Sequence, residues 1–193
     1  MTSASASSTV PAHRPVWQPL LVRAVIALAF GAVTVFWASP SVQVLAVSSG
    51  LYLLANAAVF VWQRKVDPTP KTRLPLLIAA VVSALAGVVA FVSMSDAGTT
   101  AALSVALGVT GVVELLFWFW LRGASPLARD WIVSGFVGVG TAAALPFFTY
   151  LGAHALLGVT GGAAIISGVL WILSGLSARH DVRIGATGPK AVN

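Results

Sequence analysis

The chain has no cysteine and very few charged residues, and both shortages limit what the protein can be. None of the 193 residues is a cysteine, which excludes disulfides, thiol nucleophiles, CxxC redox pairs and thiolate metal sites. Only 8% of the residues are charged and 58% are hydrophobic, whereas a soluble protein has roughly 25% charged residues. This composition predicts an integral membrane protein, with the lipid bilayer as its main partner.

The excess of basic residues does not indicate a nucleic-acid partner. The formal net charge is +6, but the lysines and arginines lie between hydrophobic runs and form no basic stripe with stacking aromatics. We interpret them as signals of membrane orientation. The sequence leaves a homo-oligomer open and identifies no soluble or membrane protein partner.

Six hydrophobic runs of about 20 residues predict an all-α membrane protein with six transmembrane helices, because such a run crosses a hydrocarbon core of roughly 30 Å. The first run is longer than the core of a signal peptide, so we expect it to be retained as a span. The predicted spans are 20–39, 42–62, 74–94, 100–121, 130–150 and 154–176.

The basic residues lie at one end of the spans, which predicts the orientation. The turns near Pro40, Asp96 and Gly152 contain no lysine or arginine, and the other connections and both terminal segments do. Under the positive-inside rule, both termini are cytoplasmic and the protein spans the cytoplasmic (inner) membrane several times. Arg23, near the start of the first span, is predicted to extend to the inner interface. The expected division is a flexible cytoplasmic segment 1–19, a transmembrane domain 20–177 and a cytoplasmic tail 178–193.

The spans form three tandem helical hairpins with an internal repeat, at about 20–62, 74–121 and 130–177. Each hairpin begins on the same side, which predicts parallel repeats about an axis along the membrane normal. Gly158 and Gly162 form a GxxxG motif that predicts close helix contact. In the second helix of each hairpin a glycine precedes a polar residue by six positions: Gly50 and Asn56, Gly108 and Glu114, Gly161 and Ser167.

The segment Gly50-Leu-Tyr-Leu-Leu-Ala-Asn56, with Gly31 in the preceding helix and Pro40 at the turn, resembles the repeat of the HdeD-like family of small six-helix bacterial membrane proteins. The resemblance implies an inner-membrane protein of the kind associated with acid resistance and stress response, and it implies no particular biochemical activity. The chain departs from the family pattern where Asn56 replaces the usual acid, where the third repeat has Ser167, and where the outer turn of the second repeat has no proline.

Glu114 is the one carboxylate deep inside a hydrophobic run, where a charged residue costs about 2.5 to 3.5 kcal/mol. One interpretation is a neutral, structural glutamic acid hydrogen-bonded to Thr110 or Asn56. The other is a proton-linked or substrate-contacting residue. Asn56 itself is typical of an interhelical hydrogen bond. Together with Ser167, these residues form the candidate intramembrane polar site.

His154 and Asp96 are the candidate pH-sensitive residues of the outer face. Histidine has an ordinary pKa near 6.5 and responds to mild acid. The alternative is an interfacial histidine without a function.

The sequence predicts no enzyme, no catalytic residues, no metal site and no cofactor. The segment Gly138-Val-Gly140-Thr-Ala-Ala143 matches a dinucleotide fingerprint in letters only, because it lies within a span and follows no strand. The histidines are distributed between the two sides, and no second acid accompanies Glu114. Two functions remain: an HdeD-like membrane protein, or a small transporter or channel with a polar path through Glu114 and Asn56.

Overall fold

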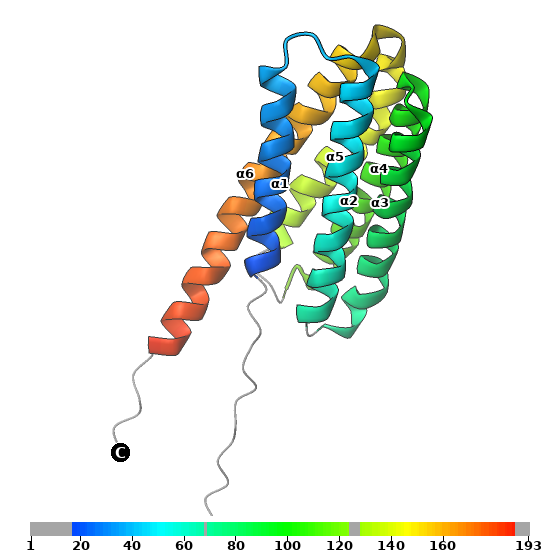
Figure 1. The fold of residues 1–193 in the computed structure, drawn as a ribbon. Coiled ribbons are helices and arrows are strands. Elements are labelled where there is room, and N and C mark those ends of the chain that lie inside the picture. The colour runs from blue at the N-terminus through cyan, green and yellow to red at the C-terminus, as the bar shows by residue number, and fades with distance from the viewer. Residues whose placement is uncertain (1–16, 68, 124–127, 188–193) are drawn as a thin grey trace, which may run out of the picture.

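The computed structural model describes residues 17–67, 69–123 and 128–187, which are almost entirely helical and contain no strand (Figure 1). Most of the predicted N-terminal segment and the last six residues of the predicted tail lie outside the described residues. Six α-helices and two short 3-10 turns follow one another: α1 (Trp17–Phe36), α2 (Val42–Val66), η1 (Pro70–Thr72), α3 (Arg73–Ser93), α4 (Asp96–Leu121), α5 (Ala128–Phe148), η2 (Thr149–Leu151) and α6 (Gly152–Thr187).

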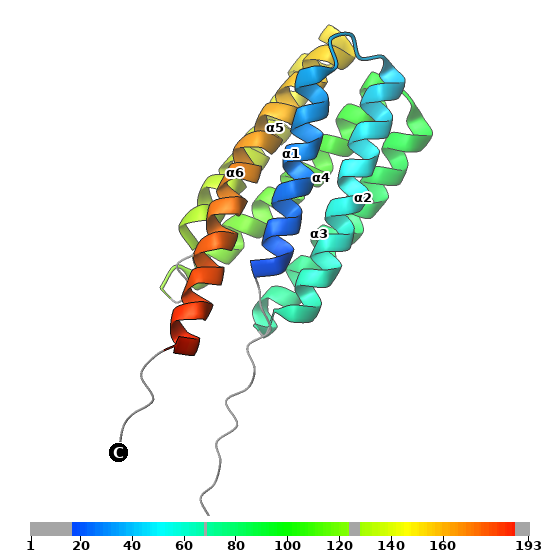
Figure 2. The ribbon, with the colours of Figure 1, turned by 60° about the vertical axis from the view of Figure 1, so that its left-hand side comes forward.

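Five helical stretches of the described chain, not the predicted six, are long and apolar enough to cross a membrane. The fifth stretch is Ala128–His180, 53 residues long, and it includes α5 and α6 as far as His180, because η2 joins them without a non-helical residue. The chain still reverses its direction there, and α5 and α6 lie side by side (Figure 2). Gly152 has a φ of 77°, a conformation that glycine adopts without strain. The apolar helices are compatible with an integral membrane protein.

The fourth helix begins earlier than the sequence predicted. We expected a turn around Asp96 and a span from residue 100, but α4 starts at Asp96 itself. The Ser95 side chain accepts a hydrogen bond from the Gly98 amide at 3.1 Å, and Asp96 adds an acidic side chain in the first turn. Both features stabilise a helix N-terminus, so the connection from α3 shrinks to Met94 and Ser95.

The polar connection between α2 and α3 is ordered by Asp67. Its carboxylate accepts hydrogen bonds from the Thr69 amide at 2.8 Å and from the Thr72 hydroxyl at 2.9 Å. These bonds hold the short turn η1 against the end of α2. The connection between the second and third predicted spans, residues 63–73, is therefore mostly structured, since α2 continues to Val66 and α3 begins at Arg73.

The last helix, α6, also extends beyond its predicted end. No proline interrupts residues 177–187, and α6 continues through them into the predicted tail. The Arg179 guanidinium lies 5.4 Å from the ring centre of Trp17, at the start of α1. This contact joins the two helices beyond the end of the predicted last span.

The most extensive helix contacts join α2 with α3, α4 with α5, and α1 with α6. These pairs link one predicted hairpin to the next, and contacts within the predicted hairpins are less extensive. Glycines explain the close approach: a Cβ added to Gly87 would lie 3.1 Å from the Gly50 carbonyl oxygen, and one added to Gly135 would lie 2.9 Å from that of Gly111. A Cβ added to Gly31 would lie 3.4 Å from the Gly161 carbonyl oxygen.

The predicted GxxxG motif makes no close helix contact within the described chain. A Cβ added to Gly158 or Gly162 would meet no atom within 4 Å, because these two glycines face away from the bundle. The glycines of α6 that do face α1 are Gly161, Gly168 and Gly175, which are spaced by seven residues. Glycines of α6 do permit close helix contact, but they are not those of the GxxxG motif, which lie on another face of the helix.

Candidate intramembrane polar site

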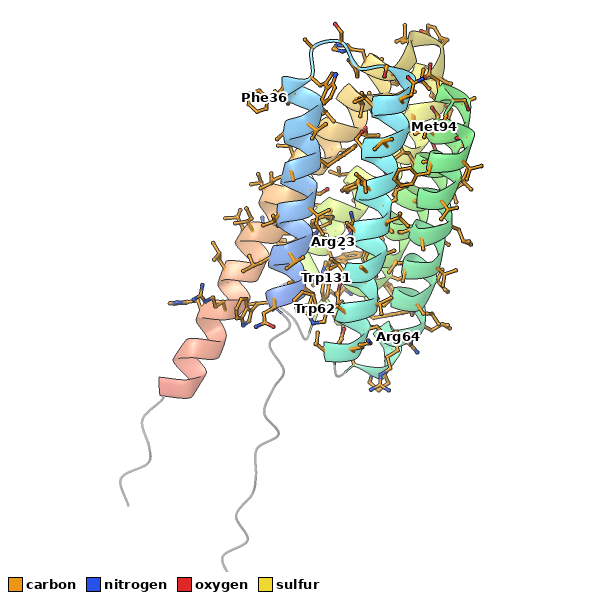
Figure 3. The ribbon with its side chains drawn as sticks, in the orientation of Figure 1. Arg23, Phe36, Trp62, Arg64, Met94 and Trp131 are labelled. Carbon is orange, nitrogen blue, oxygen red and sulfur yellow. The ribbon has the colours of Figure 1, made fainter. Side chains whose placement is uncertain are left out.

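Arg23 of α1 and Glu114 of α4 form an ion pair inside the helix bundle. Their exposed fractions are 6% and 4%. The prediction that Arg23 extends to the inner interface is therefore wrong. Figure 3 shows Arg23 within the bundle, whereas Arg64 lies at its end. A buried carboxylate offers the guanidinium a partner that compensates for the loss of water, so pairing replaces extension to the interface.

Two aromatic rings hold the guanidinium of Arg23 in place. Its Cζ atom lies 3.7 Å from the ring centre of Trp171 in α6 and 4.5 Å from that of Phe60 in α2. A cation near the face of an aromatic ring is attracted by the negative potential of that face. Four helices thus supply the immediate surroundings of one positive charge.

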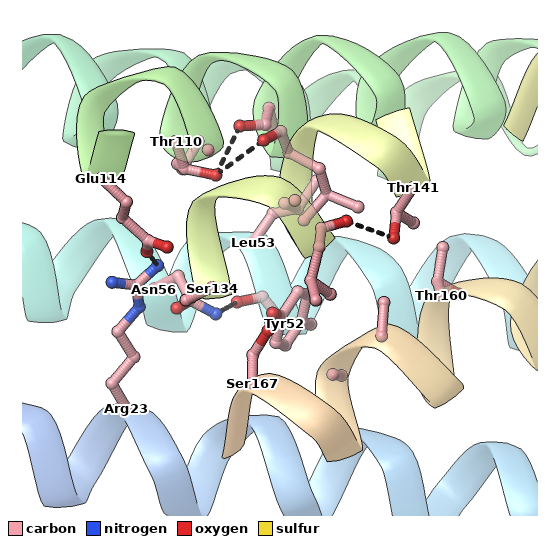
Figure 4. Close-up of a pocket in the computed structure, with 18 of the residues that line it drawn as sticks. Arg23, Tyr52, Leu53, Asn56, Thr110, Glu114, Ser134, Thr141, Thr160 and Ser167 are labelled. Carbon is pink, nitrogen blue, oxygen red and sulfur yellow. Dashed lines mark hydrogen bonds and ion pairs between the residues drawn. The ribbon is translucent and has the colours of Figure 1, made fainter. Parts of the chain in front are cut away.

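A polar cavity adjoins the ion pair and extends between the helices (Figure 4). The space in which the centre of a water molecule fits is about 30 Å³. One water needs about 10–15 Å³ on this measure, so the cavity has room for two or three waters. Polar side chains from α2 to α6 line it alongside Arg23 and Glu114: Tyr52, Asn56, Ser83, Thr110, Ser134, Thr141, Thr160 and Ser167.

Several of these polar groups are bonded to the backbone of their own helix. The hydroxyls of Thr110, Thr141 and Thr160 donate to carbonyl oxygens four residues earlier at 2.7–2.9 Å. The Asn56 amide donates to the Tyr52 carbonyl oxygen at 2.9 Å. Such bonds satisfy a buried side chain without a second helix. In one of the two sequence interpretations, Glu114 is bonded to Thr110 or Asn56, but the described residues show it paired with Arg23.

Other buried donors of the lining have no partner among the described residues. These are Arg23 Nε, Trp171 Nε1 and the Ser83 hydroxyl, from α1, α6 and α3. Each residue is at least nine-tenths buried. Leaving a buried donor unsatisfied costs about 1–3 kcal/mol, so three donors around one cavity indicate that something in it accepts hydrogen bonds.

Buried apolar side chains lie towards both ends of the bundle from the cavity. Towards the end with the α5–α6 turn lie Leu45, Leu103 and Leu156, all fully buried in one cluster. Each precedes the polar residue of its repeat, Asn56, Glu114 or Ser167, by eleven positions. Towards the opposite end, the rings of Phe117 and Trp131 meet edge to face with centres 5.6 Å apart, in a second cluster that includes Phe60.

The structure brings the predicted trio together: Glu114, Asn56 and Ser167 all line the cavity (Figure 4). The sequence interpretation missed Arg23, Ser83 and Trp171. Two signals were present: Arg23 is the one cation inside a predicted span, and Trp171 lies within a predicted span, away from the interfaces that tryptophans prefer.

The two residues predicted at the outer face, His154 and Asp96, do not line this cavity. His154 is exposed in the first turn of α6. Asp96 is in the first turn of α4, and its Oδ2 would lie 3.9 Å from a Cβ added to Gly152. Both residues are therefore at the end of the bundle where α5 reverses into α6.

Searched against protein-family models, curated proteins and solved structures, the chain matches none of them.

Proposed function

We propose that the chain is a protein of the cytoplasmic membrane that crosses the bilayer six times with both termini inside. The charge distribution over the helix ends supports this topology. The connections α1–α2, α3–α4 and α5–α6 lie at one end of the bundle and contain no lysine or arginine (Figure 1). The opposite end has the basic residues Arg64, Lys65, Lys71, Arg73 and Arg122.

We also propose that the chain is an HdeD-like protein with a role in acid or stress tolerance. The repeat glycines support it, because Gly50 packs against Gly87 and Gly31 against Gly161. A strain that lacks the gene is expected to survive acid exposure less well than the complemented strain. Equal survival of the two strains would contradict the role in acid tolerance.

The proposed activity is that of a small proton-linked transporter or channel, with no enzymatic reaction. The observation that supports it is a buried ion pair facing a polar cavity, with buried apolar side chains towards both ends of the bundle. Ionisable residues inside a membrane protein usually mark an ion or substrate pathway. Glu114 is the one carboxylate among the cavity-lining residues, and it is therefore the proposed proton carrier.

Vesicles test this activity. The purified protein is reconstituted in lipid vesicles, and the decay of an imposed pH gradient is followed in chloride buffer. We expect wild type to speed the decay and the double variant R23Q/E114Q to lose this effect, because the glutamine at position 114 cannot carry a proton. The double variant has two polar side chains and no buried charge, so it should fold. Its decay matching that of wild type would contradict the proposal.

A matched variant controls for general damage. Asp96→Asn removes a carboxylate outside the cavity and should leave the decay of the pH gradient unchanged. Melting curves of each protein in detergent establish that the variants compared are folded.

A further inference from the structure

We infer that the cavity is a binding site for a small monovalent anion, and that protonation of Glu114 transfers Arg23 from the carboxylate to this anion. The inference deepens the proposed function and rests on it for its role in transport. It names the substrate class: an anion such as chloride, taken up together with one proton.

Three of the buried lining groups without a hydrogen-bond partner among the described residues can donate, and the fourth, Glu114 Oε1, is the oxygen that pairs with Arg23. These groups favour a ligand that accepts hydrogen bonds. Arginine and the tryptophan indole are donors and never acceptors. Arg23 Nε and Trp171 Nε1 are both buried without a partner, and the Ser83 hydroxyl is a third donor without one. An anion can accept hydrogen bonds from donors of all three kinds.

The charges of the site link the anion to a proton. Arg23 and Glu114 neutralise each other, and Tyr52 is the other titratable residue in the described lining. A bound anion next to an ionised Glu114 would leave a net negative charge inside the bundle, which is strongly unfavourable. When Glu114 takes a proton, the anion replaces its lost charge and the site stays neutral.

The remaining helices add no competing charge among the described residues. The described lining side chains from α3, α5 and α6 are not titratable. Asp130 of α5 accepts a hydrogen bond from Ser174 of α6 and is not part of the lining. Phe60 and Trp171 hold the Arg23 guanidinium independently of Glu114, so the cation remains at the cavity after the carboxylate is neutralised.

The volume sets an upper limit to the ligand. Sites for drug-sized molecules are about 300–1,000 Å³. The space in which the centre of a water molecule fits is only about 30 Å³ here, which suits a small inorganic ion and excludes organic acids of metabolite size.

Thermal unfolding in detergent tests the inference, with chloride as the probe and gluconate, too large for the cavity, as the control at equal ionic strength. A ligand that binds the folded state raises the melting midpoint. Glu114→Gln imitates the protonated residue permanently. We expect chloride to raise the midpoint of E114Q by several degrees over gluconate in both acidic and neutral buffer.

Wild type should respond to chloride in acidic buffer and much less in neutral buffer, and R23Q/E114Q should not respond. If E114Q does not fold, the melting midpoints of wild type in acidic chloride and gluconate buffers test anion binding by themselves. Equal midpoints in chloride and gluconate for E114Q, or for wild type in acid, would overturn the inference and indicate a cavity that holds only water.

Ser83→Ala and Ser49→Ala form a matched pair, because both serines are buried with an unpartnered hydroxyl and only Ser83 lines the cavity. We expect S83A to reduce the chloride-dependent shift and S49A to preserve it. Equal shifts in the two variants would contradict the assignment of the site.

The failure of the anion site and the failure of the proposed function are distinguishable. Wild-type vesicles that dissipate a pH gradient equally in chloride and gluconate would support transport and contradict the anion. Chloride-dependent stabilisation without any flux would retain the anion site and contradict transport.

Discussion

Arg23 and Glu114, from helices α1 and α4, neutralise each other inside the bundle next to a polar cavity. The pair brings together the first and fourth helices, which are not neighbours in the chain. Each charge needs the other, because either one alone would be an uncompensated charge in an apolar environment. This relationship determines how the protein should respond to mutation.

Removing one partner should be far more harmful than removing both. Glu114→Gln leaves Arg23 unpaired and should lower the free energy of unfolding by about 3–5 kcal/mol, measured by denaturant titration in gluconate buffer. R23Q/E114Q should recover most of this loss, because no buried charge remains. A double variant as unstable as E114Q would contradict a direct energetic link between the two residues.

Glycine contacts between neighbouring helices predict a second contrast. A Cβ at Gly111 would lie 2.8 Å from the Gly135 carbonyl oxygen, so Gly111→Ala should force α4 and α5 apart and cost about 1–3 kcal/mol in unfolding free energy. Gly158→Ala is the control, since its Cβ would meet no atom within 4 Å. It should be neutral or stabilising by up to about 1 kcal/mol, because alanine favours helix.

A comparable loss in both glycine variants would mean that the cost arises within the helices themselves. The close contact of α4 with α5 would then not explain why the glycine is needed.

The absence of cysteine allows a direct test of orientation. Single cysteines at Lys71 and Tyr150, both exposed and at opposite ends of the bundle, should react with a membrane-impermeant thiol reagent from opposite sides. We expect labelling of Y150C in intact cells and of K71C only after the cells are opened. Labelling of K71C from outside would overturn the proposed orientation.

The sequence predicts the helices well because apolar runs of membrane-spanning length leave few other structures. The predicted helix boundaries are wrong where a cap or a short 3-10 turn extends a helix beyond its apolar run. Ser95 caps α4 and draws Asp96 into its first turn, and η2 joins α5 to α6 so that one apolar stretch replaces two.

The candidate site is only partly readable from the sequence. Spacing within the repeats indicates Asn56, Glu114 and Ser167, because equivalent positions in parallel repeats share a depth. The spacing of the repeats does not predict the partner of Glu114. Arg23 can reach either the interface or the bundle interior by side-chain length alone, and only the packing of α1 against α6 decides between them.

The central claim is that the cavity is reached by ions from solution and is not a sealed structural pocket. Silver ions test it directly, because they are small and bind thiolates tightly. Ser83→Cys places a thiol in the lining of the cavity, and Ser49→Cys places one that is equally buried but outside it. The decay of a pH gradient across vesicles is measured before and after silver is added, in nitrate buffer, because nitrate is a small monovalent anion like chloride and does not precipitate silver. The account predicts that silver stops the decay in S83C vesicles and leaves S49C and the cysteine-free wild type unaffected. An S83C flux that persists in silver, or equal inhibition of S49C, would contradict it.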